Sequence, residues 1–184
     1  MGSILSDIKN LRIQGAREVA KAGLEYVSRA SKTFKGTDKE DFQQELLKEI
    51  NRVIKIRPTE PMLINSLAAV AVDFEKAEIR TQTAMKRLIA DMCSSQRENI
   101  ESMLRRIAVN GAHEIENGDV IMTHCHSHDV MAIFAEAKRM KKDFTVIVTE
   151  TRPMYQGTKT ASELLKMGIK TKYGEDSIMA YSMK

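Results

Sequence analysis

The spacing of apolar residues in this chain changes once, near Asn117, and that change limits the folds that the chain can adopt. Before Asn117, apolar residues recur at the spacing of one buried face of an α-helix. After the turn-forming residues Asn117, Gly118 and Asp119, short apolar runs alternate with amphipathic segments. The pattern predicts two domains, an all-helical domain over residues 1–117 and an α/β domain over residues 118–184.

The first predicted domain contains several segments with helical spacing. Gly15 interrupts the first segment, which is predicted to be one helix, and the carboxylate of Asp38 can cap the second. Arg57-Pro58 and Pro61 separate the second segment from the third, because proline lacks an N–H donor and restricts the residue before it. Ser94-Ser95 predicts a break within the last segment. The segments are residues 4–27, 42–53, 62–72 and 75–115.

The second predicted domain follows the order strand, helix, strand, helix, strand. This order is typical of a parallel sheet whose connections are right-handed. Gly168 lies where the second helix should end and is predicted to be its C-terminal cap. In a parallel sheet of this type, ligands bind beyond the carboxyl ends of the strands. The segments are residues 120–123, 130–140, 144–148, 157–167 and 169–173.

The end of the first predicted strand, residues 124–128, reads HCHSH and contains three of the four histidines and one of the two cysteines. Imidazole and thiolate are zinc ligands, but a segment that changes from strand to helix separates its side chains, so we predict no metal site. Cys125 would precede a helix, whose N-terminus favours a thiolate and therefore a reactive sulfur. The alternative is a buried cysteine that packs as a small apolar residue.

The end of the second predicted strand carries further polar groups in the stretch TETRPMYQG. Arg152 can form paired hydrogen bonds to a phosphate. Gln156-Gly157 would open the next helix, which is a favourable position for an anion. The alternative is that Arg152 lies on the surface without a ligand. Because both strand ends should meet at one edge of the sheet, they predict a crevice with polar walls.

The composition excludes several functional classes. No apolar run approaches the roughly 18 residues of a membrane span, and the charged N-terminal segment lacks the apolar core of a signal peptide, so a cytoplasmic protein is expected. Two cysteines are too few for a disulfide scaffold. The net charge of +4 is spread among interleaved acidic and basic residues, and aromatic residues make up 5% of the chain. We therefore expect no direct binding of nucleic acid.

The stretches GDVIMTHCHS and VIVTETRPMYQGTKTASELLKMGI resemble a family that unites the alpha, beta and delta subunits of translation initiation factor 2B with archaeal and bacterial sugar-phosphate isomerases. Within that family the sequence is most similar to the branch of archaeal ribose-1,5-bisphosphate isomerase and initiation factor 2B-like proteins. The resemblance implies a fold class of α + α/β, in which an N-terminal helical domain precedes the first part of a Rossmann-like parallel sheet.

The resemblance also implies roles for single residues. In the isomerases the cysteine of the THC segment is catalytic, and here that residue is Cys125. The isomerases carry an Arg-Gly-Ala substrate segment near the N-terminus, but this chain has Gln14 in place of the arginine. Asp176-Ser177 matches an Asp-Ser pair other than the catalytic one, so Asp176 is not assigned a catalytic role. The implied substrate-binding residues are Gln14, Gly15, Ala16, Arg57, Pro58, Arg152 and Gln156.

An isomerase of this kind would convert ribose 1,5-bisphosphate to ribulose 1,5-bisphosphate without a cofactor, and it would be a homo-oligomer. Family members continue past the position of Lys184 into segments with a catalytic aspartate and an Asn-Lys pair, so this chain by itself is expected to be inactive or nearly so. The alternative function is an initiation factor 2B-like regulatory or scaffold subunit without catalysis. Its partner would be an initiation factor 2 subunit.

Overall fold

The computed structural model describes residues 2–183, which form two compact units. The first unit extends through Glu101 and the second begins at Ser102, so the division falls inside one long helix. The predicted domain boundary at residue 117 differs from this division, since it lies in the turn between that helix and the first strand. A domain boundary at residue 117 remains a prediction. Among the described residues, no helix is both long and apolar enough to cross a membrane.

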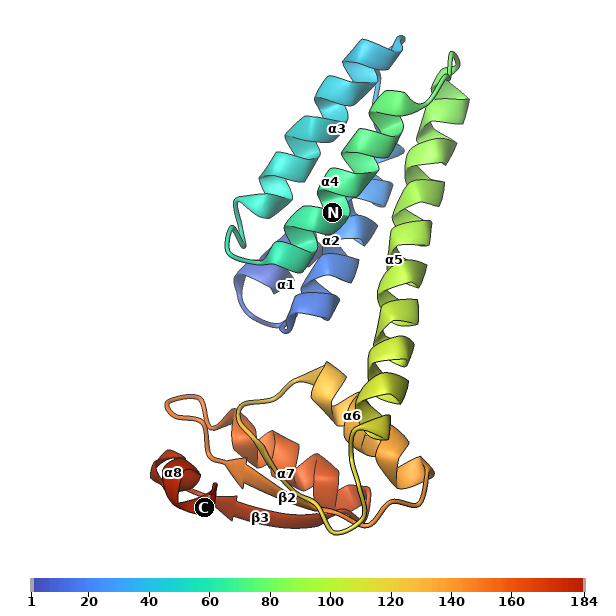
Figure 1. Cartoon of the computed structure of the whole chain (residues 1–184). Helices are drawn as coiled ribbons and strands as arrows, with labels where there is room; N and C mark the ends of the chain where they lie inside the picture. Colours follow the sequence, from blue (N-terminus) through green and yellow to red (C-terminus); the bar gives the residue numbers. More distant parts are fainter. Residues whose placement is uncertain (1, 184) are drawn as a thin grey trace. The chain divides into compact units, whose positions relative to one another are not determined.

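Amphipathic helices build the first unit (Figure 1). The carboxylate of Asp38 accepts a hydrogen bond from the Asp41 N–H and caps α3, as predicted. Pro61 is the first residue of α4, where its missing N–H leaves no helical hydrogen bond unmade. Fully buried side chains such as Leu24 and Phe74 form the core. The helices are α1 (Gly2–Lys9), α2 (Ala16–Ser31), α3 (Lys39–Ile54), α4 (Pro61–Lys76) and α5 (Gln82–His113).

The prediction of one helix over residues 4–27 is wrong. Two helices, α1 and α2, cover this stretch. Leu11 and Gly15 adopt positive φ angles of 57° and 84°, which a continuous α-helix does not allow. Gly15 is therefore the N-terminal cap of α2 and not an interruption within a helix.

The predicted break at Ser94-Ser95 is also wrong, because α5 is continuous from Gln82 to His113. The buried residues Ile89, Cys93 and Ile100 continue one apolar face past the two serines. Both serines are exposed. On the solvent side of a helix that packs well, serine lowers helix propensity only slightly, so it does not end the helix.

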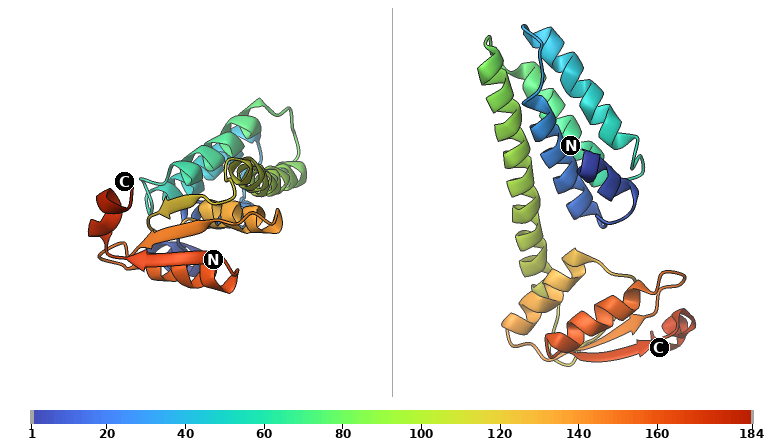
Figure 2. Two further views of the ribbon diagram at one scale, coloured as in Figure 1. Left: turned by 60° about the horizontal axis from the view of Figure 1, so that its bottom comes forward. Right: turned by 180° about the vertical axis from the view of Figure 1, so that it is seen from behind.

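The second unit contains a parallel sheet, as predicted, and the strand order in this sheet is β1-β2-β3. The register places Thr123 beside Val148 and Thr149 beside Gly174, so the strands end at the same edge. α6 and α7 cover one face of the sheet (Figure 2). Gly168, with a φ of 68°, ends α7 as predicted. The elements are β1 (Val120–Thr123), α6 (His128–Arg139), β2 (Thr145–Thr149), α7 (Gln156–Lys166), β3 (Lys170–Gly174), the 3-10 turn η1 (Asp176–Ile178) and α8 (Met179–Ser182).

Lys142 closes the C-terminal end of α5 in the second unit. The last carbonyl groups of a helix lack partners within that helix. The Lys142 ammonium group donates hydrogen bonds to the carbonyl oxygens of Ala112 and Ile115 over 2.8 and 2.5 Å, and to that of His113 over 3.3 Å. The Lys142 ammonium group therefore joins the end of α5 to the loop that precedes β2.

Replacement of Lys142 by methionine should lower the free energy of unfolding of the second unit by about 2 kcal/mol, since hydrogen bonds from a charged donor contribute about 1.5–3 kcal/mol. Hydrogen exchange of the β2 amides measures the change. Lys141→Met is the matched control, because the Lys141 side chain is exposed. Equal amide protection in the two variants would contradict the role given to Lys142.

Candidate active site

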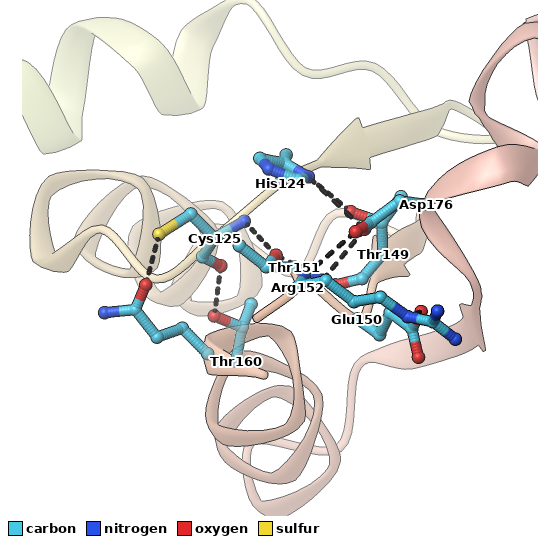
Figure 3. A network of polar contacts seen from close by, with 9 residues as sticks. His124, Cys125, Thr149, Glu150, Thr151, Arg152, Thr160 and Asp176 are labelled. Carbon is cyan, nitrogen blue, oxygen red and sulfur yellow. Dashed lines mark hydrogen bonds and ion pairs between the residues drawn. The ribbon is translucent and has the colours of Figure 1, made fainter. Parts of the chain in front are cut away.

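The loop after β1 brings Cys125 to the carboxyl edge of the sheet (Figure 3). Its φ angle is 68°, in the left-handed region that residues with a side chain seldom adopt. The Cys125 N–H donates to Thr151 Oγ1 over 2.8 Å, and the Cys125 carbonyl oxygen accepts from Thr160 Oγ1 over 2.8 Å. Hydroxyl groups from the β2–α7 loop and from α7 therefore hold both sides of this residue.

The Cys125 thiol is partly exposed and donates to Gln156 Oε1 over 3.0 Å. Gln156 is the first residue of α7. In this orientation of the Gln156 amide the thiol form makes the contact, because a thiolate can only accept a hydrogen bond.

Asp176, which follows β3, fixes the loop that carries Arg152. Its carboxylate accepts hydrogen bonds from the backbone N–H groups of Thr151 and Arg152 over 2.8 and 2.9 Å. The hydrogen bond from the Arg152 N–H, followed by that from Thr151, lowers the pKa of the Asp176 carboxyl group. The contacts give Asp176 a role in loop geometry (Figure 3).

The histidines of the HCHSH segment are held by different hydroxyl groups. His124 Nδ1 lies 2.6 Å from Thr149 Oγ1, whereas His126 Nδ1 lies 3.0 Å from Thr160 Oγ1. Within residues 2–183, no group of three or more His, Cys, Asp or Glu side chains could hold a metal ion. The rings of His126 and His128 contact each other, with centroids 5.1 Å apart, whereas His124 contacts Thr149.

Arg152 is directed by a neighbouring carboxylate. Its Nε atom donates to Glu150 Oε1 over 2.5 Å, and this contact raises the pKa of Arg152. The Arg152 side chain is 62% exposed. A ligand can therefore reach the guanidinium group from solvent.

Gly157 allows the start of α7 to approach the end of β2 closely. A Cβ atom at residue 157 would collide with the backbone carbonyl of Thr149. Glycine is required at such a close approach of two backbones. This packing places Gln156 within reach of Cys125. Gln156 makes the contact with the thiol, and Gly157 lets the two backbones come close enough for that contact.

The other predicted site residues lie in the first unit, where the α1–α2 and α3–α4 loops are at the same end of the helices (Figure 1). Gln14 Nε2 donates to the Leu11 carbonyl oxygen over 2.6 Å and so closes its own loop. Gly15, the N-terminal cap of α2, has no side chain that could bond to the first N–H groups of the helix, and such groups favour an anion. The residues concerned are Gln14, Gly15, Ala16, Arg57 and Pro58.

Three buried threonines around Cys125 were not predicted as site residues. Thr149, Thr151 and Thr160 are three of the five buried polar residues in the described chain. Two signals in the sequence point to them. Thr149 and Thr151 alternate at a strand end, and Thr160 is a β-branched residue inside a helix, where that type is disfavoured.

Iodoacetamide should alkylate Cys125 faster than Cys93. Cys93 is 1% exposed, and burial raises the pKa of its thiol to about 12, so at neutral pH it is neither accessible nor ionised. Mass spectrometry of the two cysteine peptides after timed labelling gives both rates. Equal rates, or faster labelling of Cys93, would show that the Cys125 thiol is shielded.

The amide protons of Thr151 and Arg152 should report the titration of Asp176. Because its pKa is lowered from 3.8, these hydrogen bonds stabilise the folded state fully above that value and are lost as the pH falls through the lower folded value. NMR of the amide shifts should therefore give a midpoint below 3.8, and Asp176→Asn should abolish the transition. Asp143→Asn, at the opposite end of the sheet, should leave it unchanged. A midpoint above 3.8 would refute the assignment.

The initiation factor 2 subunit family matches residues 12–184. A ribose 1,5-bisphosphate isomerase of Thermococcus kodakarensis is 35% identical over 98% of this chain and 57% of its own length. A putative translation initiation factor eIF-2B subunit 2-like protein of Pyrococcus abyssi is 33% identical over 96% of this chain and 59% of its own length.

The crystal structure of the translation initiation factor eIF-2B of Pyrococcus horikoshii has a TM-score of 0.81 to this chain and is 29% identical, and the match covers 97% of this chain and 60% of that one. The chain therefore spans little more than half the length of the proteins that it matches. The family match covers nearly all of this sequence. The chain belongs to the initiation factor 2 subunit family.

Proposed function

We propose that this chain contributes the thiol to a sugar-phosphate isomerase site that converts ribose 1,5-bisphosphate to ribulose 1,5-bisphosphate. The observation that carries the proposal is Cys125, whose sulfur contacts Gln156 at the carboxyl edge of a parallel sheet. The Thermococcus kodakarensis relative, named as a ribose 1,5-bisphosphate isomerase, supports this class of reaction. A homo-oligomer is part of the proposal because the family resemblance implies it.

A protonated sulfur suits the first step of such a reaction. The phosphate ester at C1 keeps the sugar in its ring form, so the ring oxygen must receive a proton as the ring opens. A positioned acid accelerates such a step by about 10²–10⁴-fold. The Cys125 thiol is the donor that this chain supplies. The base would be a carboxylate on the other side of the sugar, as in the isomerases that the sequence resembles.

A bisphosphate needs donors at both of its ends. Arg152 offers an exposed guanidinium group whose Nε is already fixed by Glu150. Guanidinium groups bind phosphate with paired hydrogen bonds. The resemblance also makes Arg57 and the start of α2, behind Gly15, candidate substrate-binding groups of the first unit.

Ribose 1,5-bisphosphate should slow the alkylation of Cys125, and unphosphorylated ribose should not. Arg152→Gln should raise the concentration needed for half-protection about tenfold or more, since hydrogen bonds to charged groups are among the stronger ones. Arg139→Gln is the matched control, because Arg139 is likewise an exposed arginine paired with a neighbouring glutamate, Glu136. Absence of protection at saturating bisphosphate, or the same loss in both variants, would contradict the proposal.

A regulatory or scaffold subunit without catalysis is the second candidate, and Gln14 favours it. The Gln14 amide contacts its own loop. Arg17 lies 3.5 Å from Glu18 and 4.0 Å from Glu101, and its Nε and Nη1 atoms are buried without a hydrogen-bond partner among residues 2–183. The relative named as an eIF-2B subunit 2-like protein supports this candidate. Its partner would be an initiation factor 2 subunit, and the bisphosphate would then not protect Cys125.

A further inference from the structure

Thr160 lies in the stretch TASEL of α7, to which the isomerase function gives no role. It is only 2% exposed, and its hydroxyl group reaches from α7 to the loop after β1. Thr160 Oγ1 lies 2.8 Å from the Cys125 carbonyl oxygen and 3.0 Å from His126 Nδ1. Figure 3 shows the contact of this hydroxyl group with the Cys125 backbone, and the same group also contacts the side chain of the next residue, His126.

The proton of each group in this contact can be assigned. A carbonyl oxygen only accepts, so the single hydroxyl proton of Thr160 must point to Cys125. The Thr160 oxygen can then meet His126 Nδ1 only as an acceptor, which requires the proton of the imidazole to be on Nδ1. The tautomer of His126 therefore follows from the hydrogen bond that Thr160 makes on its other side.

The surroundings of His126 favour its neutral form. The side chain is 6% exposed, and Nε2 is buried without a hydrogen-bond partner among residues 2–183. Burial, followed by the charge of Lys159, lowers the pKa of His126, and His128 lowers it further. Glu163, whose Oε1 lies 3.9 Å from Nε2, opposes them. With a neutral ring, Nδ1–H and a bare Nε2 are the only arrangement compatible with the Thr160 contact.

A similar arrangement holds the other side of Cys125. Thr151 Oγ1 donates to the Thr149 carbonyl oxygen over 3.3 Å and accepts from the Cys125 N–H over 2.8 Å. Both backbone groups of Cys125 are therefore bonded to buried threonine hydroxyls. These bonds retain the left-handed backbone conformation, and that conformation sets the direction of the Cα–Cβ bond toward Gln156.

We infer that Thr160 is a positioning residue for Cys125. The Thr160 hydroxyl group accepts a hydrogen bond from the Nδ1–H tautomer of His126 and donates to the Cys125 carbonyl oxygen. It thereby keeps the thiol directed at Gln156. The catalytic importance of the direction of the Cys125 thiol rests on the proposed isomerase function, whereas the hydrogen bonds that set this direction do not. Thr160 acts through Cys125 and needs no contact with substrate.

Thr160→Val keeps the shape of the side chain and removes the hydroxyl group. The loop after β1 should then open more often, and iodoacetamide should alkylate Cys125 about fivefold faster, the factor expected for loss of one ordinary hydrogen bond. Thr160→Ser, which retains the hydroxyl group, should restore the original rate. Thr158→Val is the matched control on the same helix, because Thr158 is exposed and its hydroxyl group contacts Tyr173. An unchanged rate in Thr160→Val, or the same rise in Thr158→Val, would overturn the inference.

The His126 tautomer gives a second measurement that needs no variant. In ¹⁵N NMR spectra of the imidazole rings, Nδ1 of His126 should carry the proton in the unaltered chain. A proton on Nε2 would overturn the inference even if Thr160→Val failed to fold. Neither measurement depends on turnover. If Thr160→Val behaves as expected but the bisphosphate does not protect Cys125, the isomerase proposal fails and the positioning role stands. If the bisphosphate protects Cys125 but Thr160→Val leaves the alkylation rate unchanged, the positioning role fails and the isomerase proposal stands.

Discussion

The candidate site depends on the common edge at which three parallel strands end. Because β1, β2 and β3 pair in register, the loops that follow Thr123, Thr149 and Gly174 leave the sheet side by side. Cys125 from the first loop and Thr151 from the second meet there, and Asp176 beyond the third strand holds Thr151 in turn. A slip of β1 by one residue would exchange the faces of its side chains and separate the Cys125 N–H from Thr151.

Threonine is well suited to a polar loop that lies at a buried edge. Each hydroxyl group gives one proton and still has lone pairs, so it can satisfy a carbonyl group and an N–H group together. Thr151 and Thr160 do so on opposite sides of Cys125. Buried backbone groups without partners are strongly destabilising, so these hydroxyls allow an irregular loop to lie where water has little access. Cys125, at the centre of the loop, keeps its left-handed backbone conformation because the surrounding hydrogen bonds fix it.

Sequence patterns were sufficient for the sheet and its two covering helices, because burial repeats locally along the chain. They failed at Gly15 and at Ser94-Ser95, where the same residue types occur in caps, breaks and exposed helix faces. Strand ends and residue types pointed to Cys125, Arg152 and Gln156. The weaker signals at Thr151 and Thr160 do not reveal their contacts with Cys125, which join residues 26 and 35 positions apart. Such contacts depend on strand register and helix rotation, which residue spacing does not determine.

Gln156 is a suitable neighbour for a sulfur that gives up a proton and takes it back. In the structure its Oε1 accepts the thiol hydrogen bond. A carboxamide also carries two N–H donors, so rotation of the same side chain can present Nε2 to a thiolate once the proton has left. A glutamate in this place would repel the thiolate, and an apolar residue would stabilise neither state. The side chain at the start of α7 can therefore serve both protonation states of Cys125, which general acid catalysis in the proposed ring opening requires.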